Sequence, residues 1–157
     1  MNKTEFTAAV LAAEPTLYRV ARSMLPCEAD CADAAQNAIL KAWERLHTLR
    51  RQEYFRTWLV RILINECRSM LRRRARFCAL EPEGEGPAPE RESYDELYEA
   101  LRSLDGKYRL PVTLYYFEGF KTAEIAAMLN LSEGTVGTRL RRARELLREK
   151  LKGECFA

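Results

Sequence analysis

The stretch from Thr122 to Lys150 constrains the fold most, because it predicts two helices separated by a turn of only a few residues. Thr122 is a candidate N-cap for a short first helix, and Ser132 is a candidate N-cap for a longer second helix. Asn130 and Leu131 form the predicted turn. The apolar positions of both helices recur at helical spacing and predict one shared core: Ile125, Ala126, Leu129, Val136, Leu140, Ala143, Leu147 and Leu151. This arrangement is typical of a helix-turn-helix.

The opposite face of the second helix is small and basic. A rotation of about 100° per residue directs these positions away from the predicted core: Gly134, Thr138, Arg141, Arg142, Glu145 and Arg148. Small residues permit a close approach to a partner, and arginines can reach guanine edges or phosphates in the major groove. A basic face is often only solvated, and a helical hairpin can serve packing alone. The short turn followed by a basic helix favours DNA binding over both alternatives.

The charge of the 157-residue chain is segregated, although its net value is only +3. Nine arginines lie between Arg50 and Arg76, against only Glu53 and Glu66 in the same stretch. A second basic cluster ends the chain, and an acidic segment separates the two clusters. Two basic regions around a contrasting connector indicate two nucleic-acid surfaces.

No apolar run is long enough to span a bilayer, and the N-terminus lacks the charged start and apolar core of an export signal. We therefore expect a cytoplasmic protein with no stable membrane insertion. Five cysteines, an odd number, favour reduced thiols. Cys27 and Cys31 could share a helix face, but the spacing of the other cysteines and of His47 does not complete a zinc site. Inert thiols are favoured over zinc binding or redox sensing, and no cofactor is expected.

The N-terminal half predicts four helices. The first two cover 4–13 and 16–25 and are separated by Pro15, because proline interrupts the helical hydrogen bonds. The third covers 30–46 and the fourth covers 55–74. Each of the last two also carries a surface with a possible function.

The outward face of 30–46 places an apolar residue among polar ones. Leu40 lies at the centre of this face, surrounded by Asp33, Gln36, Asn37, Trp43 and Glu44. Such a position is typical of a protein-docking surface, although single exposed leucines are common.

A straight basic stripe with one amide runs along 55–74, formed by Arg61, Asn65, Arg68 and Arg72. An arginine run follows the stripe, and a loop with an aromatic residue precedes the helix. This combination suits a nucleic-acid backbone better than plain solvation.

Residues 78–92 are acidic and rich in proline and glycine, with little to bury, which predicts a flexible linker. The predicted domains are therefore 1–77 and 93–157. In the second domain a helical pattern resumes at 94–104, and another helix follows with Pro111 near its start. No strand pattern of weight and no internal repeat is present. The predicted fold is all-α, with two small helical domains joined by a flexible acidic linker.

With these parts in order, the chain resembles the extracytoplasmic-function (ECF) group of bacterial RNA polymerase sigma factors, in the sigma-70 superfamily. The polymerase-binding helix of the second sigma domain resembles ADAAQNAILKAWERL. The promoter-melting and recognition helix of that domain resembles FRTWLVRILINECRSMLRRR. The helix-turn-helix of the fourth sigma domain resembles EGFKTAEIAAMLNLSEGTVGTRLRRARELL. The resemblance covers nearly the whole chain, and the missing third sigma domain also fits that group.

The resemblance implies a non-catalytic specificity subunit that binds core RNA polymerase and directs transcription from two-part promoters, in a stress or envelope response. The clamp helices of the polymerase β′ subunit would be contacted by Asp33, Gln36, Asn37, Leu40 and Trp43. The minus-10 element would be contacted by Leu49, Arg50, Arg51, Tyr54, Arg61, Asn65, Arg68 and Arg72. The bases of the minus-35 element would be read by Thr135, Thr138, Arg141 and Arg142. The backbone of that element would be held by Arg139 and Arg144.

The same resemblance implies contact with the polymerase β flap and with a cognate anti-sigma factor. The acidic linker would thread polymerase channels that later carry RNA. Two residues depart from the family pattern. Gly137 stands where the recognition helix usually has lysine or arginine, and Leu49 stands where the promoter loop often has an aromatic residue. Both departures bear on the promoter sequence rather than on the role.

Two other classes of protein remain open. A stand-alone helix-turn-helix regulator would bind duplex DNA tightly by itself and would normally dimerise. An adaptor scaffold without DNA contact would show little salt dependence. An enzyme is disfavoured, because the sequence has neither a metal-carboxylate cluster nor a glycine loop that cradles phosphate.

Overall fold

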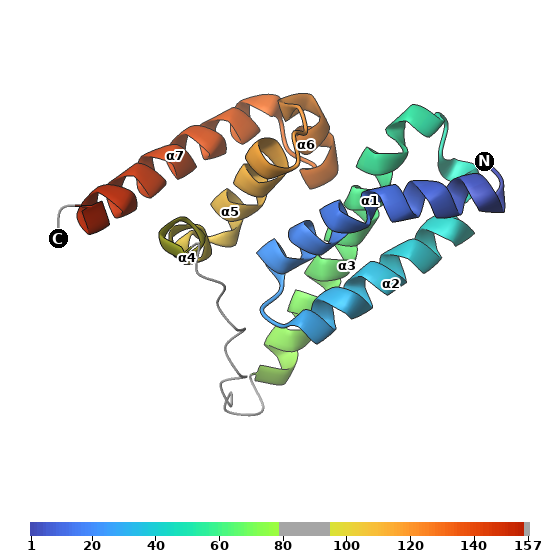
Figure 1. Ribbon diagram of the computed structural model, residues 1–157, viewed down its shortest axis with the longest axis horizontal. Helices are drawn as coiled ribbons and strands as arrows, with labels where there is room; N and C mark the ends of the chain where they lie inside the picture. Colours follow the sequence, from blue (N-terminus) through green and yellow to red (C-terminus); the bar gives the residue numbers. More distant parts are fainter. Residues whose placement is uncertain (79–94, 156–157) are drawn as a thin grey trace. The chain divides into compact units, whose positions relative to one another are not determined.

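The computed structural model describes residues 1–78 and 95–155, and every regular element in these ranges is a helix (Figure 1). The chain divides into two compact units, Met1–Ala88 (unit 1) and Pro89–Ala157 (unit 2). The prediction of an all-α fold with two small helical domains is confirmed. The predicted flexible linker lies outside the described residues, except for Cys78, which ends a helix.

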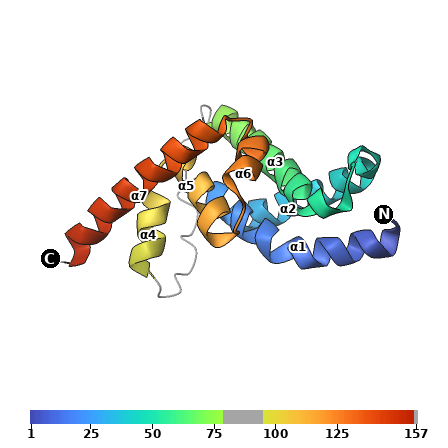
Figure 2. The same ribbon diagram turned by 90° about the horizontal axis from the view of Figure 1, so that it is seen from above.

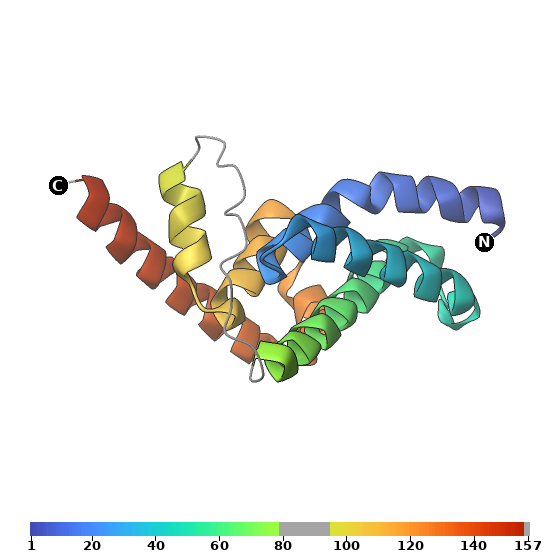
Figure 3. The ribbon, with the colours of Figure 1, turned by 90° about the horizontal axis from the view of Figure 1, so that it is seen from below.

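The described part of unit 1 contains three long helices and two short 3-10 turns: α1 (Lys3–Met24), α2 (Glu28–Glu44), η1 (Leu46–Thr48), η2 (Gln52–Tyr54) and α3 (Phe55–Cys78). Helix α3 packs against both α1 and α2 (Figure 3). The buried apolar residues of α3 therefore lie on more than one side of the helix: Phe55, Leu59, Val60, Ile62, Leu63, Ile64 and Cys67. Trp58 and Met70, on the same helix, are half-buried.

Helix α2 faces the core with small side chains. The buried residues of α2 recur about once per helical turn: Cys31, Ala34, Ala38 and Ala42. Small side chains let two helix backbones approach closely, and α2 and α3 make the most extensive helix pair of the unit. Lys41 and Glu66 form an ion pair between these helices, and Glu66 is only 5% exposed. A buried carboxylate without such a partner would be strongly destabilising.

Helix α1 is continuous through Pro15, so the prediction of two helices, 4–13 and 16–25, is wrong. The helix begins with a capping box, in which Asn2 Oδ1 accepts from the Glu5 backbone N–H at 2.8 Å and Glu5 Oε2 accepts from the Asn2 backbone N–H at 2.9 Å. Pro15 and Leu11, whose carbonyl loses its helical partner, are both exposed, so that water can bond the carbonyl. Buried side chains on both sides of Pro15 hold the helix against the core.

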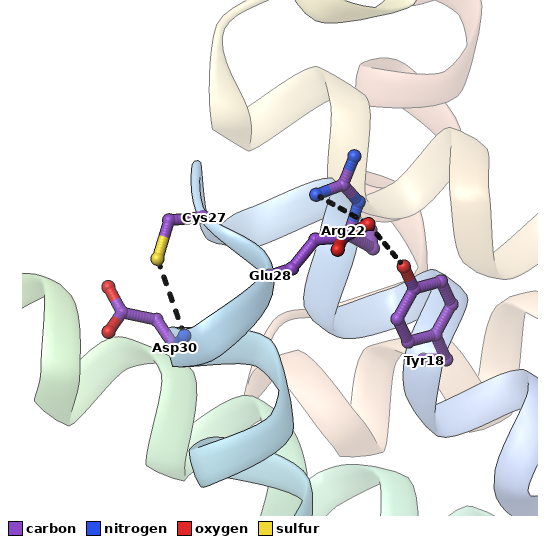
Figure 4. Close-up of polar contacts among 5 residues, drawn as sticks. All are labelled: Tyr18, Arg22, Cys27, Glu28 and Asp30. Carbon is purple, nitrogen blue, oxygen red and sulfur yellow. Dashed lines mark hydrogen bonds and ion pairs between the residues drawn. The ribbon is translucent and has the colours of Figure 1, made fainter. Parts of the chain in front are cut away.

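The corner between α1 and α2 is closed by polar contacts (Figure 4). The Tyr18 hydroxyl donates to Glu28 Oε1 at 3.1 Å, and Arg22 Nη1 lies 4.0 Å from the same oxygen. Cys27 caps α2, since its Sγ accepts from the Asp30 backbone N–H at 3.5 Å. Helix α2 therefore begins two residues before the predicted start, because the thiol replaces the oxygen that usually marks an N-cap.

The described part of unit 2 contains five helical elements: α4 (Asp95–Ser103), α5 (Gly106–Val112), η3 (Thr113–Phe117), α6 (Thr122–Leu129) and α7 (Glu133–Cys155). The long helix α7 packs against α4, α5 and α6 (Figure 2). Asp105 caps α5, with its Oδ1 accepting from the Lys107 backbone N–H at 3.1 Å.

Pro111 lies in the second half of α5, so its predicted place near the helix start is wrong. Directly after it, η3 is a π-helical turn, closed by the Glu118 backbone N–H on the Thr113 carbonyl at 3.1 Å. Proline removes one α-helical bond, and π turns appear where that ladder is interrupted. Gly119 follows the cap of η3 with a φ of 72°, a conformation that favours glycine.

Candidate nucleic-acid and protein interfaces

The turn between α6 and α7 has the geometry of a helix-turn-helix. Asn130 adopts the left-handed conformation, with φ 55° and ψ 48°, and the Leu131 backbone N–H donates to the Ala126 carbonyl at 3.0 Å. Ser132 caps α7 as predicted, since its Oγ accepts from the Thr135 backbone N–H at 3.1 Å. The predicted cap of α6 is wrong by one residue: Thr122 is the first helical residue and Lys121 is the cap.

The cap of α6 differs from the predicted one because the Glu124 side chain accepts a hydrogen bond from a backbone N–H at the start of the helix. The Lys121 backbone N–H donates to Glu124 Oε1 at 3.2 Å. This bond is the carboxylate half of a capping box, so that the helix does not need the Thr122 hydroxyl as its cap.

Helix α7 has the two faces that its sequence predicts. Val136, Leu140 and Ala143 are buried, while Leu147 and Leu151 are half-buried towards the C-terminus. The positions predicted to point outward are all exposed: Gly134, Thr138, Arg141, Arg142, Glu145 and Arg148. We call this second set the α7 outer face.

Hydrogen bonds hold several side chains of the α7 outer face and its margins. Thr138 Oγ1 donates to the Gly134 carbonyl at 2.9 Å, and Arg142 Nη1 lies 3.2 Å from Glu145 Oε2. Thr135, at the margin, is half-buried and its Oγ1 lies 2.8 Å from Ser132 Oγ. The arginines therefore project from a helix whose first turns are fixed by short polar contacts.

Arg139 and Arg144 lie on opposite flanks of α7. At about 100° per residue they are displaced from Arg142 in different directions around the helix axis. Arg139 is half-buried, whereas Arg144 is exposed and donates from Nη1 to the Tyr116 hydroxyl at 2.8 Å. This hydrogen bond raises the pKa of the Arg144 guanidinium above its usual value. The structure thus places Arg144 beside η3, and its contact with the DNA backbone stays a prediction.

Gly137 is exposed, and a Cβ at this position would meet no atom within 4 Å. We expect Gly137→Ala to stabilise unit 2 by about 1 kcal/mol, because glycine in a helix interior is less favourable than alanine by that amount. Thermal unfolding followed by far-UV circular dichroism measures the gain. Both tryptophans, Trp43 and Trp58, belong to unit 1, so the transition seen by tryptophan fluorescence serves as the unchanged control. A lowered melting temperature for unit 2 would count against this account of Gly137.

Unit 2 also has an open apolar groove of about 730 Å³, which the sequence did not predict. We call it the unit 2 groove, and its lining includes Leu97, Leu101, Val112, Tyr116, Phe117, Leu147 and Leu151. Basic side chains complete the lining, namely Arg144, Arg148 and Lys152. Three consecutive aromatic residues, Tyr115, Tyr116 and Phe117, are all at least partly exposed at 38%, 50% and 43%. This aromatic run could have indicated an exposed apolar surface from the sequence alone, because one helix face cannot bury three adjacent aromatic side chains.

The outward face of α2 is exposed as the sequence predicts. Asp33, Gln36 and Asn37 are exposed, and Leu40 is 62% exposed although it is a large apolar residue. Trp43 is 45% exposed, and its ring packs on Phe6 with the centroids 5.0 Å apart. The Trp43 ring is therefore held in place by Phe6, whereas the Leu40 side chain projects into solvent. We call these five residues the α2 surface.

The basic stripe of α3 is also accessible. Arg61, Asn65 and Arg72 are exposed, and Arg68 is half-buried. The arginine run after the stripe is not wholly free, because Arg74 Nη1 lies 3.0 Å from Asp30 Oδ2 and ties the end of α3 to the start of α2.

The loop before α3 joins η1 to η2 and carries the other predicted minus-10 residues. Arg50 and Arg51 are exposed, and Arg51 Nη1 lies 3.5 Å from Glu53 Oε1. Tyr54 is 55% exposed, whereas Leu49 is half-buried. The loop therefore presents one aromatic ring and two guanidinium groups, which suit stacking and phosphate contacts with unpaired DNA.

Cys27, Cys31 and Cys67, the cysteines of unit 1 whose burial the structure describes, differ in accessibility. Cys31 and Cys67 are buried, and burial raises the pKa of the Cys31 thiol to about 11 and that of Cys67 to about 12. Cys27 is half-buried. Among residues 1–78 and 95–155, no three His, Cys, Asp or Glu residues come together as a metal site. No helix in that same part of the chain is long and apolar enough to cross a membrane.

We expect iodoacetamide at about pH 8 to alkylate Cys27 at least about tenfold faster than Cys31 or Cys67, because the half-buried Cys27 is the only one of these three thiols that the reagent can reach. Raising the pH by one unit leaves the two buried thiols protonated, since their pKa values lie higher still. Peptide mapping by mass spectrometry measures each rate separately, and denaturant should remove the difference. Equal rates in the folded protein would show that the buried thiols are reactive.

The two units together define a class of protein: an all-α DNA-binding factor with a helix-turn-helix in one unit and an exposed α2 surface in the other. Comparison with known families identifies it further. Residues 10–77 match the family described as Sigma-70 region 2, and residues 94–147 match that described as Sigma-70, region 4. The chain belongs to the sigma-70 family, and it is an RNA polymerase sigma factor of the ECF type.

Individual relatives and solved structures agree with this assignment. The RNA polymerase sigma factor SigV of Bacillus subtilis is 30% identical over 98% of this chain and 98% of its own length. The ECF sigma factor SigM of Mycobacterium tuberculosis is 33% identical over 83% of this chain and 69% of its own length. RpoE of Bartonella quintana, solved with the anti-sigma factor NepR, has a TM-score of 0.81 and 28% identity, covering 94% and 97% of the two chains. CnrH, solved with the cytosolic domain of CnrY, has a TM-score of 0.73 and 29% identity, covering 97% and 90%.

Proposed function

We propose that this sigma factor directs core RNA polymerase to promoters with two elements, using unit 1 for polymerase and melted DNA and unit 2 for the upstream element. The observation that carries the proposal is the α2 surface, where Leu40 projects 62% exposed from a folded unit that also carries a basic stripe. Unlike Leu11, which is equally exposed on α1, Leu40 lies beside the exposed Trp43 and among polar side chains, an arrangement that suits a partner protein.

The α2 surface binds the clamp helices of the polymerase β′ subunit. Leu40 supplies an apolar anchor, and Trp43 is already ordered by Phe6, so little side-chain entropy is lost on binding. The polar residues around them, Asp33, Gln36 and Asn37, form the rim of the contact.

The loop from His47 to Tyr54, with Asn65 nearby, receives an unpaired base of the minus-10 element, and the arginines of the α3 stripe hold the adjacent backbone. A base that leaves the duplex can stack on the exposed Tyr54 ring. Arg61, Arg68 and Arg72 offer charge to phosphates along one side of the helix, with Asn65 beside them.

The α7 outer face reads the minus-35 element in the major groove. Thr138 lies close to the centre of the face, and Arg142 lies at one edge of it, about 40° from Thr138 around the helix axis, from where its long side chain can reach base edges. Arg141 extends the contact along the groove, and Thr135 adds a hydroxyl near the helix start. Arg139 and Arg144, on the flanks, reach the DNA backbone when the helix lies in the groove.

The unit 2 groove binds the β flap of the polymerase. Its leucines and aromatic rings provide an apolar seat for a helix, and Arg148 and Lys152 provide charge at the edge. An anti-sigma factor would regulate the protein by covering such surfaces, as the complexes of RpoE with NepR and of CnrH with CnrY suggest by likeness. The protein acts in the cytoplasm, where core polymerase is found, in a stress or envelope response. It is not itself an enzyme, because the polymerase performs the synthesis.

Transcription from a genomic fragment library tests this function. Core RNA polymerase with the purified protein is expected to produce discrete transcripts that core alone does not make, and alignment of their start sites should reveal two conserved elements upstream. Transcripts that are identical with and without the protein would exclude a sigma factor activity.

A further inference from the structure

We infer that Glu145 determines how selectively unit 2 recognises its DNA element, by holding Arg142 in an ion pair on the α7 outer face. Arg142 Nη1 lies 3.2 Å from Glu145 Oε2, one helical turn away, and each side chain is 51% exposed. The inference rests on the proposed function of this face in DNA recognition.

The place of Glu145 on the helix is what makes the pair unusual. At about 100° per residue, Glu145 lies within about 20° of Thr138 around the helix axis, near the centre of the α7 outer face. A carboxylate there is repelled by every phosphate of an approaching duplex. It is not needed for the core, since its side chain is exposed. Its effect is therefore exerted on the contact with DNA.

The ion pair affects the two kinds of contact that Arg142 can make to different degrees. A phosphate contact depends on the positive charge of Arg142, which Glu145 partly neutralises. A contact with a guanine edge depends on two aligned N–H groups, and the guanidinium has five. Arg142 can therefore keep Nη1 on Glu145 and still donate to guanine through its remaining N–H groups. The pair weakens contacts with any DNA and leaves base readout largely intact.

Glu149 provides a matched control. It is exposed on the same side of α7, about 40° around the axis from Glu145 and one turn farther from the start of the helix. Glu149→Gln removes the same charge as Glu145→Gln, without removing the partner of Arg142. A general electrostatic effect is common to both variants, whereas an effect through Arg142 appears only in Glu145→Gln.

The test uses holoenzyme formed from the full chain and two templates with the same minus-10 element. One template carries the intact upstream element found by the library experiment, and the other carries a scrambled one. Glu145→Gln is expected to raise transcription from the scrambled template more than from the intact one, lowering their ratio about threefold. Glu149→Gln is expected to raise both equally and to leave the ratio unchanged.

A double variant shows whether Glu145 acts through Arg142. In an Arg142→Ala background, Glu145→Gln should leave the ratio as it is in Arg142→Ala alone, because the group it holds is absent. The inference is overturned if Glu145→Gln leaves the ratio unchanged, matches Glu149→Gln, or acts equally in both backgrounds. Lower transcription from the intact template alone would also overturn it, since Glu145 would then contact the element itself. A wild-type holoenzyme that does not distinguish the templates would instead contradict the proposed function of the face.

Discussion

Leu40→Asp is expected to weaken binding to core RNA polymerase by at least about thirtyfold, the size of effect typical of a central interface residue. The substitution removes an apolar anchor and leaves an unpaired carboxylate in the contact. Unit 1 should remain folded, because Leu40 is 62% exposed and contributes little to the core. Binding is measured by titrating labelled protein with core polymerase.

Leu11→Asp is the matched control for this experiment. Leu11 belongs to the same unit, lies on α1 and is also 62% exposed, but it is not part of the α2 surface. The Leu11→Asp variant should bind core RNA polymerase with the affinity of the wild-type protein. If Leu40→Asp also bound normally, with both variants folded, the clamp helices would have to contact another surface.

Arg142→Ala is expected to reduce transcription that depends on the minus-35 element by about tenfold or more, because a bidentate base contact contributes about 1–3 kcal/mol to discrimination. Binding to core polymerase should be unchanged, since Arg142 lies in unit 2 and away from the unit 2 groove. The measurement compares run-off transcripts from templates with intact and scrambled upstream elements.

Arg102→Ala controls for the loss of one positive charge from unit 2. Arg102 is exposed on α4 and does not belong to the α7 outer face. The Arg102→Ala variant should still transcribe the template with the intact upstream element in preference to the scrambled one. Equal preference in wild type and Arg142→Ala would mean that another side of α7 enters the groove.

The elements of this fold were largely predictable because their local signals are strong. Ser132 caps α7 through its own hydroxyl, and the stripe from Val136 to Ala143 needs only helical spacing to be recognised. Leu40 could be assigned to the surface because its neighbours on the helix are polar.

The errors arose where a local signal competes with its surroundings. Proline normally ends a helix, yet α1 continues through Pro15 because buried residues on both sides pack against the core. Cys27 and Lys121 cap their helices although neither is a usual N-cap residue. These outcomes depend on tertiary packing and on single hydrogen bonds, which spacing in the sequence does not specify.

The unit 2 groove and the Arg142 pair could not be predicted for a different reason. The groove is lined by α4, α5, η3 and α7, so it requires the packing of distant segments. Arg142 had several possible acceptors, and only the side-chain conformation identifies Glu145 as its partner. The sequence therefore indicated the DNA-binding face, but not what restrains the arginine on it.

The most direct test of the central claim is size-exclusion chromatography of the purified protein with bacterial core RNA polymerase, paired with a duplex-binding measurement on the protein alone. A sigma factor is expected to elute with core and to bind promoter duplex only weakly without it. Tight duplex binding by the protein alone, with no complex with core, would contradict the account and indicate a stand-alone helix-turn-helix regulator.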